Sequence, residues 1–324
     1  MRIIVLGGTR FIGRAITEEL VGHGHQVMVV HRGRSEPEAW VDVEHLHVDR
    51  AELGTVSPQL LSFVPDAAID CLAMTGADAE AALAVLPAEL RLVVLSSMDV
   101  YRAYGAVQAD RVDEPVPLYE DSPVRDERYP YRGQIPGMDD YEKLDVEEAY
   151  LGRRATVCRL PMVYGEHDGQ RREWPILRRV HAGRTRIPIG AGTWVTTWGY
   201  VGDVASGVRL VVECEAAAGE IFNLGASRSP TIELWARQVL AAAESDAELV
   251  HVPDELLPED LGITAAIPQP LLCDSAKARS VLGWREVDPA EALRRSVAWH
   301  LANPPDADLD FEADDRALAG ADPA

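Results

Sequence analysis

The sequence begins Met1-Arg-Ile-Ile-Val-Leu-Gly-Gly-Thr-Arg-Phe-Ile-Gly13, and this stretch decides the fold. Its short apolar run predicts a buried strand, the glycines after it predict a tight turn, and the residues that follow have the apolar spacing of a helix. Gly7 allows the turn, Gly8 keeps a side chain away from a ligand, and Gly13 lets the helix pack closely on the strand. Unpaired amides at the start of such a helix bind a diphosphate well. The opening stretch therefore predicts a dinucleotide-binding site.

The pattern of strand followed by helix continues through the first half of the chain. The expected strands are short apolar runs at residues 26–30, 44–48, 67–73, 91–97 and 155–160, with helical spacing between several of them, including residues 139–151. Strands that alternate with helices in this way form a parallel sheet wound on both faces. The sequence therefore predicts an α/β protein of the Rossmann type, with a smaller C-terminal α/β substrate domain.

The domain boundaries follow from where this regular alternation stops. We expect residues 1–165, together with about 195–222, to form the dinucleotide-binding domain, and residues 166–194 and 223–303 to form the substrate-binding domain. The last segment, residues 304–324, carries many acidic residues against Arg316 alone. Because such a segment buries little apolar area, we expect an acidic, disordered tail.

Bulk composition excludes several classes of protein. The formal net charge of −22 argues against nucleic-acid partners, because nucleic-acid binding needs Lys and Arg against the phosphates. No apolar stretch is long enough for a membrane span and no signal peptide precedes the first strand, so a cytoplasmic protein is expected. His45 and His47 share one face of an expected strand, but no third ligand is evident beside them. No metal site is therefore predicted.

The residues after the second expected strand indicate the cofactor. NAD sites usually carry an acidic residue there for the ribose 2′-hydroxyl, whereas NADP sites carry arginine for the 2′-phosphate. Here the run is His31-Arg-Gly-Arg34, with Arg10 in the glycine loop nearby. These arginines favour NADP, with NAD as the alternative. Asp49, at the end of the third expected strand, is positioned to bind the adenine amine.

Several further motifs resemble those of the short-chain dehydrogenase/reductase superfamily, in its extended or atypical epimerase/dehydratase branch. They are GGTRFIG from Gly7, SSMDVY from Ser96, the helix from Lys143 to Glu147, RLPMVYG from Arg159, YVGDVASG from Tyr200, IFNLG from Ile221 and DSAKARSVLGW from Asp274. The resemblance implies an NAD(P)-binding Rossmann fold and hydride transfer at a small-molecule alcohol or ketone. Homodimers are common in this superfamily.

The resemblance also implies roles for individual residues. Ser97 would hydrogen-bond the substrate oxygen, and Lys143 would bind the nicotinamide ribose, unless Lys143 only pairs with Glu147 one helical turn away. The positions expected to contact the cofactor are Gly7, Thr9, Arg10, Phe11, Ile12, Arg32, Asp49, Ala73, Lys143, Pro161 and Val163.

The expected proton donor departs from the pattern of the superfamily. Its members usually have a tyrosine four residues before the active-site lysine, where this sequence has Asp139. Tyr141 is the nearby tyrosine, but two residues along a regular helix correspond to a rotation of about 200°. Tyr141 would then face away from Lys143 unless the helix begins late. The candidates for the proton donor are Tyr141, then Lys143 itself, then Asp99.

Two more departures bear on the substrate. Members that act on sugar nucleotides carry an arginine for the substrate diphosphate where this sequence has Thr196, and dehydratases carry a second acid where it has Met98. Reduction or epimerisation of a sugar derivative or secondary metabolite is therefore favoured over dehydration. A dinucleotide-binding sensor or scaffold without turnover is the alternative, and an RNA-binding role is the least favoured because of the charge.

Overall fold

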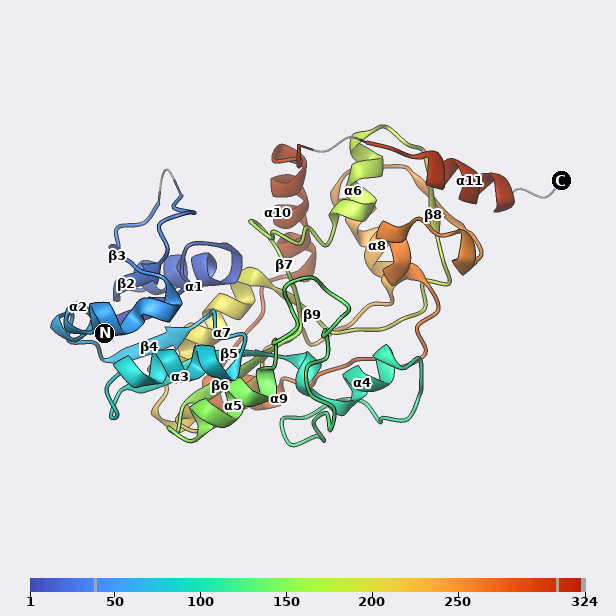
Figure 1. The fold of residues 1–324 in the computed structure, drawn as a ribbon. Helices are drawn as coiled ribbons and strands as arrows, with labels where there is room; N and C mark the ends of the chain where they lie inside the picture. Colours follow the sequence, from blue (N-terminus) through green and yellow to red (C-terminus); the bar gives the residue numbers. More distant parts are fainter. Residues whose placement is uncertain (38–39, 307–308, 322–324) are drawn as a thin grey trace.

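The computed structural model describes residues 1–37, 40–306 and 309–321. Its centre is a seven-stranded parallel sheet with the strand order β10-β6-β5-β4-β1-β2-β3 (Figure 1). The strands are β1 (Arg2–Leu6), β2 (Gln26–His31), β3 (Glu44–His47), β4 (Ala67–Asp70), β5 (Arg91–Ser97), β6 (Thr156–Leu160) and β10 (Ile221–Asn223). The chain reverses its direction across the sheet between β1 and β4, and ligands of such folds bind at the carboxyl ends of the strands there. The Rossmann-type fold predicted from the sequence is confirmed.

Alternate residues of β1 enter separate cores on the two faces of the sheet. Ile3 and Val5 pack in a cluster with residues of α1 (Phe11–Gly22) and α7 (Val201–Glu213). Ile4 and Leu6 pack in a second cluster with residues of α3 (Gly76–Val85) and α5 (Lys143–Leu151). A strand that is apolar on both sides is expected in a sheet covered by helices on both faces.

Shorter elements complete the sheet region. They are the α-helices α2 (Ser57–Ser62), α4 (Arg102–Gln108) and α9 (Ala276–Leu282) and the 3₁₀ turns η1 (Arg50–Val56), η2 (Met98–Val100) and η3 (Glu215–Ala217). The division into two domains stays a prediction, and α9, which was expected in the second domain, packs against β10 and α7 of the first.

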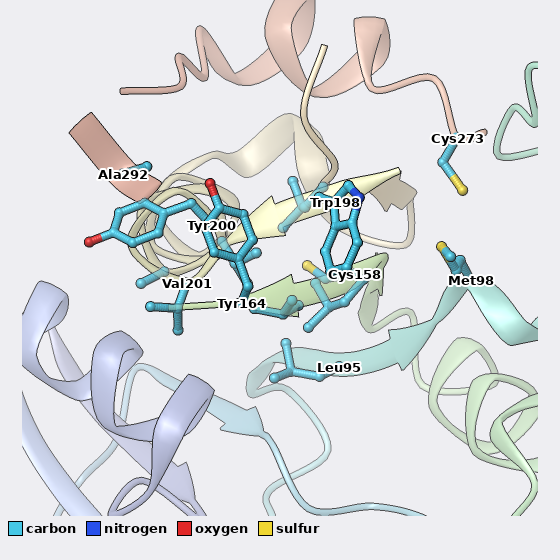
Figure 2. Packing of buried hydrophobic residues seen from close by; sticks show 14 of the residues in the cluster. Leu95, Met98, Cys158, Tyr164, Trp198, Tyr200, Val201, Cys273 and Ala292 are labelled. Carbon is cyan, nitrogen blue, oxygen red and sulfur yellow. The ribbon is translucent and has the colours of Figure 1, made fainter. Parts of the chain in front are cut away.

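The rest of the chain lies beyond the carboxyl ends of the central strands (Figure 1). It contains the pairs β7 (Met162–Tyr164) with β9 (Trp198–Tyr200) and β8 (Arg186–Ile189) with β11 (Glu248–His251), and the elements α6 (Trp174–His181), α8 (Ile232–Ala242), η4 (Asp254–Leu256), η5 (Glu259–Thr264) and α10 (Pro289–Ala302). Tyr164, Trp198 and Tyr200 pack together above Leu95 and Cys158 of the central sheet (Figure 2). One continuous apolar core therefore joins this region to the sheet.

The prediction of a disordered tail is wrong for residues 312–321. These residues form α11 (Glu312–Ala321), in which Ala317 and Leu318 are buried. Asp314 is also buried, and its carboxylate accepts two 2.7 Å hydrogen bonds from Arg179 of α6. A specific ion pair thus holds a segment whose composition alone gives little reason for order. Among the described residues, no helix is both long and apolar enough to cross a membrane.

Candidate functional site

The glycine loop borders a cavity of about 520 Å³ at the carboxyl ends of β1 and β2. Five of the predicted cofactor positions contribute to its lining, namely Gly7, Thr9, Arg10, Arg32 and Asp49. Ser35, which was not among the predicted positions, also lines the cavity, and its hydroxyl lies 3.1 Å from the Thr9 hydroxyl. The predicted phosphate loop and the segment after β2 therefore form two walls of one cavity.

Two glycines of the loop are required by close packing inside the protein. A Cβ atom on Gly13 would lie 2.0 Å from the Gly7 carbonyl oxygen, which confirms the predicted close approach of helix and strand. A Cβ atom on Gly8 would lie 2.5 Å from the Thr17 hydroxyl and 2.8 Å from Val29. The prediction that Gly8 makes room for a ligand is therefore wrong, because its missing side chain makes room for α1 and β2.

The start of α1 is suited to an anion. Arg10 occupies the N-cap position without a side-chain cap, and the first turn contains no acidic residue. The first amides of a helix have no partner within the helix, and the helix dipole adds positive charge there. Phe11 and Ile12, predicted to contact the cofactor, belong to this first turn. An uncapped helix start beside a cavity with arginines is a suitable donor set for the diphosphate of a dinucleotide.

Cations dominate the part of the cavity wall that follows β2. Arg32 and Arg34 line the cavity there, and Arg10 of the glycine loop lines it as well. Asp49, which follows β3, also lines the cavity, although its carboxylate already accepts a 3.2 Å hydrogen bond from the Ala51 amide. Asp78, the other aspartate at the wall, caps α3 through the Thr75 and Met74 amides.

The helix that carries Lys143 begins four residues later than predicted. Residue Glu142 has an extended backbone, with φ −154° and ψ 100°, and Lys143 is the first residue of α5. Along extended backbone, residues two apart point to the same side. Tyr141 and Lys143 are therefore on one side, and the Lys143 Nζ lies 6.0 Å from the centre of the Tyr141 ring.

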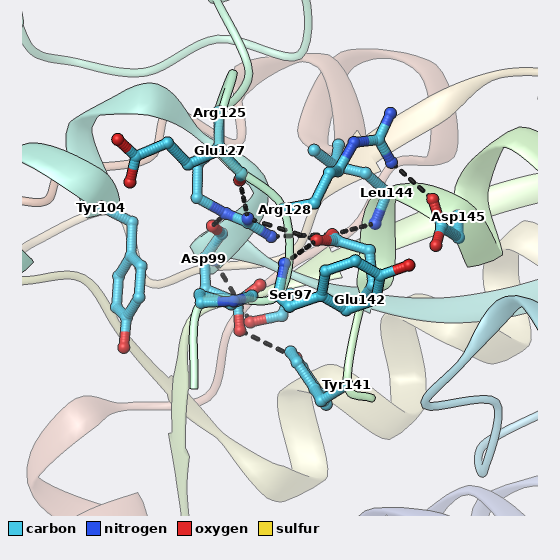
Figure 3. A network of polar contacts seen from close by, with 12 residues as sticks. Ser97, Asp99, Tyr104, Arg125, Glu127, Arg128, Tyr141, Glu142, Leu144 and Asp145 are labelled. Carbon is cyan, nitrogen blue, oxygen red and sulfur yellow. Dashed lines mark hydrogen bonds and ion pairs between the residues drawn. The ribbon is translucent and has the colours of Figure 1, made fainter. Parts of the chain in front are cut away.

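Tyr141 is hydrogen-bonded to Asp99, another predicted catalytic residue (Figure 3). The distance from the Tyr141 hydroxyl to Asp99 Oδ2 is 2.8 Å, and the Tyr131 hydroxyl donates to the same oxygen at 3.0 Å. Tyr104 in turn donates to the Tyr131 hydroxyl at 2.9 Å. A chain of hydrogen bonds thus runs from Tyr104 through Tyr131 and Asp99 to Tyr141. Tyr131 was not among the predicted site residues.

Burial sets the protonation of these groups. Burial raises the pKa of Asp99 above its usual range, although the hydrogen bonds from the tyrosines oppose the shift. Burial and the neighbouring Asp99 carboxylate both raise the pKa of Tyr141 well above its usual range. Burial lowers the pKa of Lys143. The raised pKa keeps the Tyr141 hydroxyl protonated, so it can act as a proton donor. The other carboxylate oxygen of Asp99, Oδ1, is buried and has no hydrogen-bond partner among the described residues.

A buried ion pair holds the irregular start of α5 in place (Figure 3). Arg125 donates a 2.9 Å hydrogen bond to Glu142, and both side chains are almost fully buried. Glu142 also accepts from the Tyr129 and Leu144 amides at 2.6 Å and 2.9 Å. Arg125 additionally donates to the Asp99 carbonyl oxygen at 2.5 Å. Arg125 and Glu142, which the sequence analysis missed, therefore position both Asp99 and Tyr141.

Lys143 and Ser97 lie at the carboxyl edge of the sheet. The Lys143 Nζ donates to the carbonyl oxygens of Ala73 at 2.5 Å and Leu95 at 3.0 Å. The alternative in which Lys143 pairs with Glu147 is wrong, because Glu147 binds Arg159 and Ser96 instead.

The hydroxyl of Ser97 accepts a 3.2 Å hydrogen bond from the Asp99 amide. Ser97 pairs in register with Leu160, and Pro161 follows directly. Pro161 and Val163 are thus close to this edge, but neither lines the cavity beside the glycine loop.

Comparisons with known proteins show which sequences and folds the chain is similar to. A family model described as "NAD dependent epimerase/dehydratase family" matches residues 3–225. Chloroplast stem-loop binding protein of 41 kDa b from Arabidopsis thaliana is 28% identical over an alignment of 317 positions, and this alignment covers 91% of this chain and 78% of the relative.

Two solved structures illustrate the similarity in fold. The dTDP-glucose 4,6-dehydratase from Bacillus anthracis, in complex with NAD, has a TM-score of 0.71 at 15% identity and covers 94% of this chain and 97% of its own. The UDP-glucose 4-epimerase from Thermotoga maritima, with UDP-glucose, has a TM-score of 0.69 at 19% identity and covers 92% of this chain and 98% of its own.

Proposed function

The chain belongs to the NAD dependent epimerase/dehydratase family, and from this premise we propose that it is an NADP-preferring oxidoreductase or epimerase. The substrate is a small-molecule alcohol or ketone, such as a sugar derivative or secondary metabolite. The observation that carries the proposal is the convergence of Tyr141, Lys143, Ser97 and Asp99 at the carboxyl edge of β5. Such an edge is where this fold binds its ligands.

The cofactor preference rests on the cavity beside the glycine loop. The uncapped start of α1 would hold the diphosphate, and Arg32 and Arg10 would hold the 2′-phosphate. Guanidinium groups match phosphate in both charge and geometry. When bound, the nicotinamide ring supplies or accepts the hydride.

The proton chemistry is assigned to the residues around Asp99. Tyr141 donates its hydroxyl proton to the substrate oxygen during reduction, and Ser97 hydrogen-bonds the same oxygen. The cationic Lys143 stabilises the tyrosinate that forms. The tyrosinate regains its proton from water after the product has left, and Tyr131 and Tyr104 extend the hydrogen-bonded chain away from Asp99. Oxidation of an alcohol uses the same groups in reverse.

Dehydration is less well supported. Met98 lies at the position where the dehydratases of this superfamily have an acid. It is an apolar core residue with 5% of its surface exposed. Thr196, which replaces their diphosphate-binding arginine, is fully buried and donates to the Leu271 carbonyl oxygen. Neither residue offers the polar group that such a reaction on a nucleotide sugar needs.

Calorimetry with NADPH and NADH tests the cofactor assignment. We expect the wild-type protein to bind NADPH at least about tenfold more tightly, which corresponds to about 1.4 kcal/mol. The variant Arg32→Ser should lose most of this preference, whereas Arg228→Ser, at an exposed position outside the cavity, should keep it. Tighter binding of NADH by the wild type would contradict the assignment.

A substrate panel tests the reaction. The protein is incubated with NADPH or NADP⁺ and a set of ketones, alcohols and nucleotide sugars, with absorbance at 340 nm and chromatography of the products as readouts. Net cofactor oxidation or reduction identifies an oxidoreductase, and an isomeric product without net change identifies an epimerase. Cofactor binding without either outcome across the panel would favour a non-catalytic sensor or scaffold.

The name of the Arabidopsis relative raises stem-loop binding as a second candidate. The formal net charge of −22 works against it, since affinity for RNA depends on neutralising its phosphates. We expect no salt-sensitive retention of a stem-loop RNA in a filter-binding assay. Tight retention that weakens steeply with salt would establish the second candidate instead.

A further inference from the structure

Three histidines gather on one face of the sheet where β2 and β3 end. In the parallel pairing of these strands, His31 is in register with His47, and His45 precedes His47 by two residues. Side chains two apart in a strand share a face, and partners in register share a face as well. The pairing of the strands therefore brings the three imidazoles together.

Glu36 completes the cluster from the segment that follows β2. Its Oε1 lies 2.5 Å from His47 Nε2, 3.5 Å from His31 Nε2 and 3.8 Å from His45 Nδ1. His31 Nε2 and His45 Nδ1 are 2.8 Å apart. All four candidate ligand atoms lie within 4.8 Å of one another. The expectation that His45 and His47 have no third partner is therefore wrong, because the structure brings two more to them.

We propose that His31, Glu36, His45 and His47 form a binding site for a divalent transition-metal ion, with zinc as the best match. Zinc prefers four ligands in a tetrahedral arrangement, with Zn–N distances of about 2.0–2.1 Å. Ligand atoms placed tetrahedrally at that distance from the metal are about 3.3 Å from one another. This value lies within the range of 2.5–4.8 Å that separates the candidate ligand atoms of the four side chains. Three imidazole nitrogens and one carboxylate suit zinc, whereas Mg²⁺ and Ca²⁺ prefer oxygen ligands.

Metal binding must change which ring nitrogen of His31 carries the proton. Its Nδ1 now accepts a 3.1 Å hydrogen bond from the Gly33 amide, so the neutral ring carries its proton on Nε2, toward His45. Coordination through Nε2 moves this proton to Nδ1, where it can no longer accept from Gly33. The segment from Arg32 to Ser35 must then adjust its backbone. Metal occupancy and the position of Arg32 are accordingly coupled.

The site is open to solution on one side and closed on the other. The side chain of His31 is 5% exposed, whereas that of His47 is 54% exposed. His31 also lines the cavity beside the glycine loop. If the proposed function holds, a bound divalent cation would lie beside the adenosine half of the cofactor and add positive charge near its 2′-phosphate.

Metal uptake by the untagged, chelator-treated full-length protein tests the site. Zn²⁺ is titrated by calorimetry, and Co²⁺ is titrated while its visible absorption is recorded, because tetrahedral Co²⁺ absorbs more strongly than octahedral Co²⁺. Neither measurement needs the cofactor or a substrate, so failure here is separate from failure of the proposed function. We expect one equivalent of each metal and a tetrahedral cobalt spectrum.

Matched variants assign the ligands. His45→Ala and His47→Ala should each weaken Zn²⁺ binding by about 100-fold or more and abolish the tetrahedral cobalt spectrum. His23→Ala, which removes an exposed histidine that contacts Glu19 of α1, should bind as the wild type does. Absence of uptake by the wild type would overturn the proposal. Equal uptake by all three variants would overturn it as well, because the metal would then bind elsewhere.

Discussion

The Tyr141 hydroxyl donates a 2.8 Å hydrogen bond to Asp99 Oδ2, although the two residues are 42 positions apart in the chain. The contact depends on the extended backbone at Glu142, which delays the start of α5 until Lys143. In a helix that began at Asp139, Tyr141 would face away from Lys143. Because α5 begins late, Tyr141 and Lys143 lie on the same side of the chain although they are two residues apart and not four.

Removal of the Tyr141 hydroxyl should stop turnover without unfolding the protein. Tyr141→Phe keeps the ring and deletes the proton donor, and general acid catalysis contributes about 10²–10⁴-fold to a rate. We expect kcat to fall by at least about 100-fold while NADPH affinity changes little, as measured by steady-state kinetics and calorimetry. Tyr119→Phe, at an exposed tyrosine, serves as the control. Wild-type turnover by Tyr141→Phe would exclude this tyrosine as the donor.

Loss of the charge on Glu142 should destabilise the protein as a whole. Glu142→Gln leaves the buried Arg125 guanidinium without its counter-charge, and breaking a buried ion pair costs about 3–5 kcal/mol. Glu148→Gln, an exposed position on the same helix, should change the free energy of unfolding by no more than about 0.5 kcal/mol. Urea unfolding of both variants measures the difference. Equal stability of the two would show that the ion pair does not hold the start of α5.

Much of the fold could be predicted from the sequence because its signals are local. The glycine loop, the apolar strands and the turns between them each occupy a few consecutive residues, and β5 was predicted at its observed bounds, Arg91–Ser97. The start of α5 could not be found in this way. It depends on Arg125, which lies 17 positions before Glu142 and reaches it only in the folded chain.

The same distinction applies to the sites. Ser97, Asp99 and Lys143 were identified from motifs, but the convergence of Tyr131 on Asp99 required the path of the long segment before α5. The histidine cluster shows most clearly which contacts cannot be predicted from the sequence alone. The spacing of His45 and His47 was visible, whereas the in-register pairing of His47 with His31 belongs to the sheet.

Stability should depend on pH through Asp203, which is buried at the start of α7. Burial raises the pKa of this carboxyl to about 6, and nearby Glu286 contributes to the increase. The native state therefore binds more protons than the unfolded state between pH 4 and pH 6, so this group's contribution to stability falls as the pH rises through that window.

Asp203→Asn removes this titration, because the asparagine stays neutral and its Oδ1 can still accept from the Val287 amide. The Tm of Asp203→Asn minus that of the wild type should increase by about 2–4 °C between pH 4.5 and pH 7. Calorimetric scans of both proteins across this range measure the difference. A difference that stays constant with pH, or that decreases, would contradict the assigned shift.

The docking of α11 should depend on Asp314 far more than on the adjacent Asp315. Arg179 is fully buried and bonds both Asp314 and Asp260, so Asp314→Asn leaves a buried guanidinium with one of its two carboxylates. We expect a cost of about 2–4 kcal/mol in the free energy of unfolding. Asp315 pairs with Arg184 at the surface, and loss of an exposed pair costs at most about 1 kcal/mol.

Limited proteolysis and urea unfolding distinguish the two variants. Asp314→Asn should release the segment after residue 303 for cleavage, and its unfolding midpoint should fall, whereas Asp315→Asn should behave almost as the wild type does. A chain shortened to residue 303 should lose stability too, because Asp260 is then the carboxylate that Arg179 keeps of the two that it binds. If Asp314→Asn resists cleavage as well as Asp315→Asn, apolar contacts such as those of Leu318, and not the ion pair, would hold α11.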